Sequence, residues 1–169
     1  MPAAEDQDAS AFLERVRRSG ITVDRNGRFV HEGQEVRHEG LRQALFRWLD
    51  RLPPPDDRYI LRLDGERFAY LTVEDTPLVA TSARLDGDTV WLGLTDGSEA
   101  ALDPTALTLD QAGVLRCRVR QGRIEARLGP AAASLLAERI GNTGQGPRLR
   151  LGSASFPLLA YASSSPRGG

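Results

Sequence analysis

The chain has 169 residues, 40% of them hydrophobic, and a formal net charge of -1. This length and composition suit one domain of ordinary size, or two small domains that share an interface. All 22 basic residues are Arg, and the absence of Lys excludes Schiff-base chemistry, a Walker-type phosphate lysine and a Ser-Lys nucleophile. The balanced charge supplies no general attraction to nucleic acid or to a membrane surface.

Cys117 is the only cysteine, so the chain can form neither an internal disulfide nor a multi-cysteine metal site. The N-terminal segment MPAAEDQDAS is acidic and lacks the apolar core of a signal peptide, and no apolar run approaches the length of a membrane span. We therefore expect a cytoplasmic protein in a reducing compartment, with no membrane association.

The N-terminal part is predicted to form a helix, a hairpin and a second helix. Ser10 can cap a short helix that ends at Gly20. Residues 21–24 and 28–31 alternate as strands around Asn26-Gly27, the sequence of a two-residue type I′ turn. Residues 39–52 then repeat apolar side chains with helical spacing, until three prolines end the helix.

The second of these helices has a well-defined apolar stripe, which we expect to be buried. Its members are Leu41, Ala44, Leu45, Trp48, Leu49 and Leu52. Phe46 lies beside this stripe, where it either widens the buried face or meets a second layer.

Short, evenly spaced strands separated by turn residues dominate the remainder, which indicates a mainly antiparallel sheet or a roll. The predicted strands are 59–63, 67–73, 79–85, 89–95, 98–102, 114–120, 123–128, 148–151 and 156–161. A helix capped by Gly129 runs to Ile140, with Gly141 as its stop. The glycine-rich run 141–146 follows a helix and precedes a strand, which is the wrong order for a phosphate-binding loop.

One pattern occurs twice: a strand, a turn with Gly-Arg, a strand and a helix, at residues 21–52 and again at 114–140. The repetition predicts two α+β units, each with its own hairpin and helix. We expect an N-terminal arm at 1–19, a first domain at 20–81, a second domain at 82–162 and a disordered tail at 163–169.

The stretch RFAYLTVEDTPLVA, residues 67–80, predicts two central strands joined by a tight acidic corner. Glu74 and Asp75 follow a core strand directly, so they could act as acid and base or bind a divalent cation. Asp-x-Pro is also ordinary turn chemistry, because Asp75 can bond the backbone two residues on and Pro77 presets φ. Both interpretations stay open, and the turn is favoured.

His31 is the third candidate catalytic residue, beside Glu74 and Asp75. With His38, the only other histidine, and one carboxylate it could complete a facial metal triad. The spacing of the two histidines is not that of a helical ligand pair, so we predict neither a metal nor a cofactor. Cys117 alternates with apolar neighbours and is predicted to be a core residue rather than a nucleophile.

The hairpin around Gln121-Gly122 carries an unusual density of arginine. A two-residue turn would pair Arg120 with Arg123, Arg118 with Glu125 and Arg116 with Arg127, all on one face. Like charges directly opposite one another cost stability, so acidic groups from a neighbouring layer, a bound anion or solvent must compensate them. The candidate ligand-binding residues are therefore Arg116, Arg118, Arg120, Arg123 and Arg127, and Arg148 and Arg150 could extend the patch.

Aromatic side chains are absent from this patch, so it lacks the stacking platforms of a nucleic-acid surface. A small anionic ligand or a protein partner fits it better, and a merely solvated face is the competing interpretation.

Short segments in a constant order resemble an uncharacterised bacterial family, domain of unknown function 1285 (DUF1285). The most specific is VEDTPLV at residues 73–79, which is similar to the family's V-E-D-x-P-[FL]-V segment. Residues 24–33, 119–122, 125–128 and 155–158 also match. The resemblance implies an N-terminal β-roll-like unit and a C-terminal α+β roll, and it implies no activity.

Two classes of function follow from these patterns. The first is a non-enzymatic binding or regulatory module for a small anionic ligand or a protein partner. The alternative is a hydrolase or lyase built on Glu74 and Asp75, with assistance from His31 and a metal.

Overall fold

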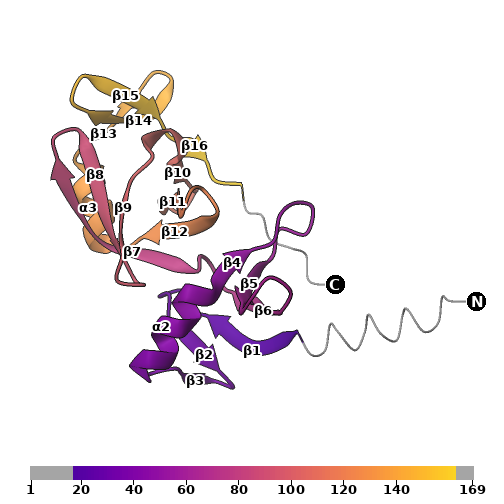
Figure 1. Cartoon of the computed structure of the whole chain (residues 1–169). Helices are drawn as coiled ribbons and strands as arrows, with labels where there is room; N and C mark the ends of the chain where they lie inside the picture. Colours follow the sequence, from indigo (N-terminus) through magenta and orange to yellow (C-terminus); the bar gives the residue numbers. More distant parts are fainter. Residues whose placement is uncertain (1–16, 163–169) are drawn as a thin grey trace, which may run out of the picture. The chain divides into compact units, whose positions relative to one another are not determined.

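The structure is a computed structural model in which residues 17–162 are described (Figure 1). The chain divides into two compact units, residues 1–75 and 76–169. The division falls after Asp75 rather than after residue 81, because strand β7 (Leu78–Asp86) runs through that position without a break. Residues 10–16 of the helix predicted from Ser10 and the tail predicted at 163–169 lie outside the described residues, and Arg18 and Ser19, placed in the N-terminal arm by the sequence, belong to strand β1 instead.

The described part of unit 1, residues 17–75, is a six-stranded sheet with one helix against it (Figure 1). The strands follow the order β3-β2-β1-β6-β5-β4, and only β1 and β6 run parallel. The elements are β1 (Arg18–Val23), β2 (Phe29–His31), β3 (Gln34–Glu35), α2 (Glu39–Trp48), β4 (Leu49–Arg51), β5 (Tyr59–Arg62) and β6 (Phe68–Val73).

The hairpin between β1 and β2 is confirmed, but its turn differs from the predicted type I′. Asp24 and Arg28 pair through the backbone, so three residues form the loop and Gly27 takes the left-handed conformation with φ 78°. The carboxylate Oδ1 of Asp24 accepts the N–H groups of Asn26 and Arg28 at 2.8 and 3.0 Å. These two bonds favour the longer loop over the predicted two-residue turn.

Helix α2 begins as predicted and ends four residues early. His38 is the N-cap, and its Nδ1 accepts the N–H of Leu41 at 3.2 Å. Leu49 leaves the helical conformation and pairs with Leu61 across β4 and β5. A leucine at this position suits either periodicity, and the hydrogen bonds of the sheet decide in favour of the strand.

The buried face of α2 is rotated from the predicted stripe. Phe46 is 3% exposed and packs edge-on against Phe29, with 4.8 Å between the ring centroids. It widens the buried face, which was one of the two predicted alternatives. Leu41, predicted to be buried, is 45% exposed.

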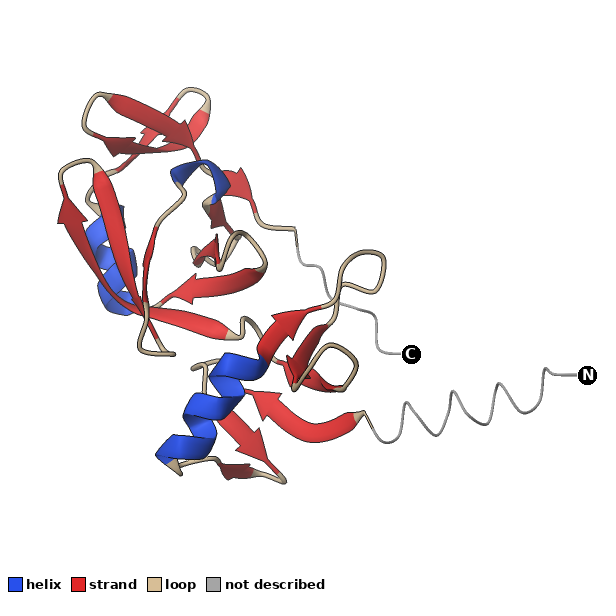
Figure 2. Cartoon of the chain, in the orientation of Figure 1, coloured by secondary structure: helices blue, strands red, loops and turns tan. Residues whose placement is uncertain are grey.

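Between residues 76 and 162, unit 2 contains a seven-stranded sheet, a separate three-stranded sheet and one helix of more than a single turn (Figure 2). The large sheet has the order β16-β10-β11-β12-β7-β8-β9, with β7 parallel to β12 and β10 parallel to β16. The elements of unit 2 are β7, β8 (Thr89–Leu94), β9 (Glu99–Ala101), η1 (Pro104–Ala106), β10 (Thr108–Leu109), β11 (Leu115–Val119), β12 (Ile124–Leu128), α3 (Pro130–Ala137), β13 (Ile140–Thr143), β14 (Gly146–Leu151), β15 (Ala154–Pro157) and β16 (Leu159–Ala160).

Strands β13, β14 and β15 form a sheet of their own, which corrects the prediction that 148–151 and 156–161 close a single sheet. Helix α3 ends at Ala137, and Gly141 is a strand residue paired with Arg148 rather than a helix stop. The run 141–146, predicted as a loop, is largely the hairpin between β13 and β14.

The predicted α+β class with mainly antiparallel sheets is confirmed, and both hairpin-helix elements are present. In unit 2, Gly129 lets α3 start directly beside β7: its N–H donates to the carbonyl of Ala80 at 2.8 Å. A Cβ at this position would lie 3.0 Å from that oxygen, which explains the glycine. No helix among residues 17–162 is long and apolar enough to span a membrane.

The rotated face of α2 can be tested by truncating Phe46. We expect Phe46→Ala to lower the free energy of unfolding by about 3–5 kcal/mol, because it leaves a cavity beside Phe29. Leu41→Ala on the same helix is the control and should change it by no more than about 0.5 kcal/mol. Urea denaturation followed by circular dichroism measures the free energy of unfolding of both variants. An equal loss of stability in the two variants would mean that the predicted stripe, with Leu41, is the buried face of the helix instead.

Candidate functional site

The acidic corner, Glu74–Pro77, connects β6 of unit 1 to β7 of unit 2. Each strand is central in its own sheet, so the prediction of two central strands is confirmed, although they belong to different sheets. Glu74 extends the β1–β6 ladder by donating its N–H to the carbonyl of Val23 at 2.9 Å. Its carboxylate Oε2 accepts the N–H of Arg25 at 3.2 Å, which ties the end of β6 to the β1–β2 turn.

Thr76 is the residue of the corner with the clearest structural role, and sequence reasoning did not single it out. It is 1% exposed, and its Oγ1 donates to the carbonyl of Leu78 at 2.7 Å. The same oxygen accepts the N–H of Arg127 at 3.0 Å and so joins β12 to the start of β7. Asp75, immediately before it, is half-buried. A hydroxyl residue between an acid and a proline, just before a buried strand, is the signal that could have identified Thr76.

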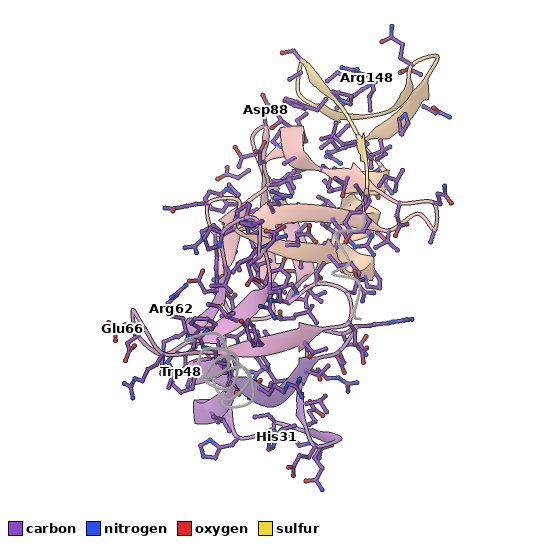
Figure 3. The ribbon with its side chains drawn as sticks, turned by 90° about the vertical axis from the view of Figure 1, so that its right-hand side faces the viewer. His31, Trp48, Arg62, Glu66, Asp88 and Arg148 are labelled. Atoms are coloured by element: carbon purple, nitrogen blue, oxygen red, sulfur yellow. The ribbon has the colours of Figure 1, made fainter. Side chains whose placement is uncertain are left out.

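His31, which Figure 3 labels, is not brought together with Glu74 and Asp75. It is exposed and pairs with Ile21 in β1, whereas Glu74 lies on the opposite side of β1, beyond the pair Val23 and Val73. Two strand spacings and a shift of three residues put the two backbones about 14 Å apart. Within residues 17–162 no three His, Cys, Asp or Glu side chains are grouped closely enough to hold a metal ion.

Cys117 lies inside β11, paired with Ala126, and is 2% exposed. Burial, with a smaller contribution from the charge of Glu125, raises the pKa of its thiol to about 12. The thiolate is therefore scarce near neutral pH, so Cys117 is a core residue, as the sequence predicts.

The predicted inertness of Cys117 can be measured directly. The shift of its pKa from 9.0 to about 12 alone lowers the thiolate fraction roughly 1,000-fold at pH 8. We expect iodoacetamide to alkylate one thiol in the protein unfolded by guanidinium, and none in the native protein over the same time. Rapid labelling of the native protein, followed by mass spectrometry, would show that Cys117 is accessible and contradict this placement.

The arginine face comprises Arg116, Arg118, Arg120, Arg123 and Arg127. The pairs of Arg116 with Arg127 and of Arg118 with Glu125 are confirmed. The predicted pair of Arg120 with Arg123 is not formed, because the ladder ends at Val119 and Ile124. Residues 120–123 form a four-residue turn instead. Arg120 and Gln121 take left-handed backbone conformations with φ 51° and 60°. Such conformations are unfavourable for side chains other than glycine, so contacts elsewhere must hold the turn.

Asp96 holds this turn through an ion pair with Arg120 at 2.9 Å. The side chain of Asp96 is 7% exposed and also accepts the N–H and hydroxyl of Ser98. Burial raises the pKa of this carboxyl, but the hydrogen bonds from Ser98 and Arg120 outweigh it, so the net shift is downward. The ion pair fixes Arg120 in place and neutralises its charge.

Arg116 is the most deeply buried member of the arginine face. Its Nη1 lies 2.7 Å from Oδ2 of Asp110, and its guanidinium carbon lies 4.2 Å from the centre of the Tyr161 ring. The hydroxyl of Tyr161 is 3.5 Å from a carboxylate oxygen of Glu125. The bond from Arg116, followed by the N–H of Val114, lowers the pKa of Asp110. Arg116 is therefore a fixed charge with its own counterion.

Arg118 differs from these two arginines because its side chain is exposed. Among the described residues, no hydrogen bond or ion pair of its guanidinium is present. The sequence suggested three ways to compensate the arginine charges, and for Arg116 and Arg120 the charge is compensated by acidic side chains from other segments. Arg148 and Arg150 do not extend the arginine face, since they lie on β14 in the separate sheet.

The pair of Asp110 and Arg116 predicts a pH-dependent coupling. Because the pKa of Asp110 is lowered on folding, its contribution to stability is present above its unfolded pKa of 3.8 and is lost as pH falls through the folded pKa. We expect a double-mutant cycle of Asp110→Asn and Arg116→Ala to show a favourable coupling near pH 7. That coupling should decrease at a pH below 3.8, where Asp110 becomes protonated. A coupling that is equal at both pH values would contradict the ion pair.

Comparisons with solved structures identify this fold. A DUF1285 family protein from Silicibacter pomeroyi DSS-3 superposes with a TM-score of 0.69 at 18% identity, over 85% of this chain and 81% of that chain. A DUF1285 family protein from Shewanella baltica OS155 superposes with a TM-score of 0.58 at 16% identity, over 70% of this chain and 90% of that chain. No protein-family model and no curated protein matches the sequence. The resemblance to DUF1285 proteins is thereby confirmed for the fold.

Proposed function

We propose that the chain is a cytoplasmic member of the DUF1285 family and a non-enzymatic binding or regulatory module, whose arginine face binds a small anionic ligand or a protein partner. The observation that carries this proposal is the state of Arg118. It is an exposed guanidinium in the middle of a paired strand, and no contact among the described residues satisfies it.

The surroundings of Arg118 favour an anion. Arg116 and Arg120 precede and follow it by two residues, so their backbones lie about 7 Å away on either side. Asp110 and Asp96 hold these two neighbours in fixed positions. A carboxylate or phosphate that contacts Arg118 would form a charge-assisted, bidentate hydrogen bond on a rigid strand, and the rigidity reduces the entropy lost on binding.

A small carboxylate or phosphate ligand is our specific choice for this face. Glu125 stands opposite Arg118 and would repel a ligand that extends across the ladder. A compact anion can contact Arg118 from the solvent side and avoid that repulsion. The strands that carry the arginines have no aromatic side chain, and the ring of Tyr161 is already in contact with Arg116, which argues against nucleic acid as the ligand.

The alternative, a hydrolase or lyase built on Glu74 and Asp75, has less geometric support. The carboxylate of Glu74 is engaged by the backbone of the β1–β2 turn. His31, the predicted third member, lies on the other side of β1. A general acid or base must reach the atom that it protonates within hydrogen-bonding distance, and these residues do not converge on one point.

A thermal-shift screen of anionic metabolites and nucleotides tests the arginine face. A ligand at 100 times its Kd should stabilise the parent protein by about 2.7 kcal/mol. We expect Arg118→Ala to lose this stabilisation. Arg84→Ala, which removes an exposed arginine on β7 of the same unit, should retain it.

Two outcomes of this screen would contradict the proposal. One is an equal thermal shift in the parent and in Arg118→Ala, which would place the ligand elsewhere. The other is a shift that survives in Arg118→Ala and disappears in Glu74→Gln/Asp75→Asn, which would favour the carboxylate-based alternative.

A further inference from the structure

The separate sheet β13-β14-β15 has an outer face with a strongly basic character. From Arg139 to Ala162 the sequence contains three arginines and neither Asp nor Glu, although the whole chain has a net charge of -1. Two acidic side chains lie at the ends of this sheet rather than at its centre. Glu138 lies 3.9 Å from Arg139, and the carboxylate of Asp88 lies against Gly152 at the β14–β15 turn. The centre of the face therefore has an uncompensated positive charge.

The register of the sheet determines which residues share this face. Leu149 and Leu151 of β14 are buried, so Arg148 and Arg150, which alternate with them, point outward. Gly141 pairs with Arg148, and Ser155 pairs with Arg150, so both belong to the same face. We call these four residues, Gly141, Arg148, Arg150 and Ser155, the outer face. Figure 3 labels Arg148 on this sheet.

The two arginines of the outer face lie flat and point in opposite directions. The Nε of Arg148 donates to Oγ of Ser155 at 2.8 Å, and its Nη2 donates to the carbonyl of Ser155 at 3.0 Å, so its guanidinium lies over β15. The guanidinium of Arg150 lies over β13, where its Nη2 would be 3.6 Å from a Cβ placed on Gly141. The small residues Gly141 and Ser155 leave room for this arrangement.

This divergence argues against a single small anion as the ligand. Gly141 and Ser155 lie on strands that flank β14, so the two guanidinium groups are separated laterally by about 10 Å. One carboxylate or phosphate cannot reach both at hydrogen-bonding distance. The outer face instead suits an extended chain of negative charges. In an extended peptide, alternate side chains project to one side at intervals of about 7 Å, and the length of two glutamate side chains lets their carboxylates reach guanidinium groups about 10 Å apart.

From these observations we infer that the outer face binds an acidic, extended segment of a partner protein. Guanidinium groups recognise carboxylates through planar, bidentate hydrogen bonds, and Arg148 is already held in place by Ser155. Strands β13 and β15 are the edges of this sheet, where an extended segment can align. The only aromatic residue of the sheet, Phe156, pairs with the buried Leu149 and so faces away, which leaves no stacking surface for nucleic-acid bases.

The test uses a fluorescein-labelled peptide of alternating glutamate and threonine, about 16 residues long, and fluorescence anisotropy with the full chain. We expect saturable binding that weakens as salt is added. Arg148→Ala/Arg150→Ala should weaken it about tenfold or more, since two charge-assisted contacts are lost. Arg150→Ala alone, which leaves the bonds between Arg148 and Ser155 intact, should produce an intermediate loss.

The matched control is Arg37→Ala/Arg67→Ala, which removes two exposed arginines from unit 1 and changes the net charge equally. It should alter binding by less than about twofold, because Arg37 and Arg67 lie outside the outer face, whereas attraction through net charge alone would weaken equally in both double variants. Arg118→Ala should leave peptide binding unchanged, so failure of this inference and failure of the proposed anion site can be told apart. Circular dichroism confirms that each variant is folded.

Three results would overturn the inference. Equal losses in the two double variants would show that the peptide responds only to net charge. Undiminished binding by Arg148→Ala/Arg150→Ala would place the peptide elsewhere. Tighter binding of a duplex DNA of about 20 base pairs that depends on the same two arginines would identify a nucleic-acid surface instead.

Discussion

Strands β6 and β7 come from a single run of chain, and each must hydrogen-bond on both sides in a different sheet. The corner between them therefore has to end one ladder and begin another within four residues, without leaving buried polar groups unsatisfied. Glu74 completes the first ladder through the carbonyl of Val23. Thr76, fully buried, begins the second through its bonds to Leu78 and to the N–H of Arg127. Loss of either set of bonds would expose the edge of a central strand.

This constraint explains why the corner resembles a catalytic site in sequence and does not assemble one in space. Adjacent carboxylates after a core strand are typical of active sites, but here the carboxylate of Glu74 accepts a backbone N–H from a neighbouring turn. The hydroxyl of Thr76 likewise accepts a backbone N–H, that of Arg127, at the start of β7. Polar residues concentrate at the corner because the backbone N–H and C=O groups at the end of β6 and at the start of β7 need hydrogen-bond partners there.

The sequence predicts the local features of the fold well, because hairpins and helix starts depend on neighbouring residues. The hairpin of β11 and β12, the alternation that buries Cys117 and the cap at Gly129 all follow from periodicity and turn chemistry. The end of α2 was wrong because Leu49 suits a helix and a strand equally, and its partner Leu61 lies twelve residues away. Strands β13 to β15 pair locally through two hairpins, and only their separation from the large sheet depends on residues far along the chain.

The charged groups show the same limit. The stripe of five arginines follows from the period of a strand, but the acids that serve two of them cannot be read from it. Asp110 lies in the segment before β11, and Asp96 lies in the turn between β8 and β9, 24 residues from Arg120. The predicted pair of Arg120 and Arg123 was wrong for this reason, since a partner outside the hairpin holds Arg120 in the turn.

Two kinds of basic surface thus occur in unit 2, and they differ in how their charge is compensated. On the arginine face, Asp110 and Asp96 lie within 2.9 Å of Arg116 and Arg120, so of the three arginines that follow one another at intervals of two, Arg118 contributes most of the attraction for an external anion. On the outer face, the bonds from Arg148 to Ser155 satisfy the geometry of the guanidinium but leave its charge uncompensated. A neutral hydrogen-bond acceptor orients a cation without neutralising it. For that reason the outer face, although smaller, can retain the longer-range attraction, while on β11 of the arginine face Arg118 is an exposed contact between two fixed neighbours.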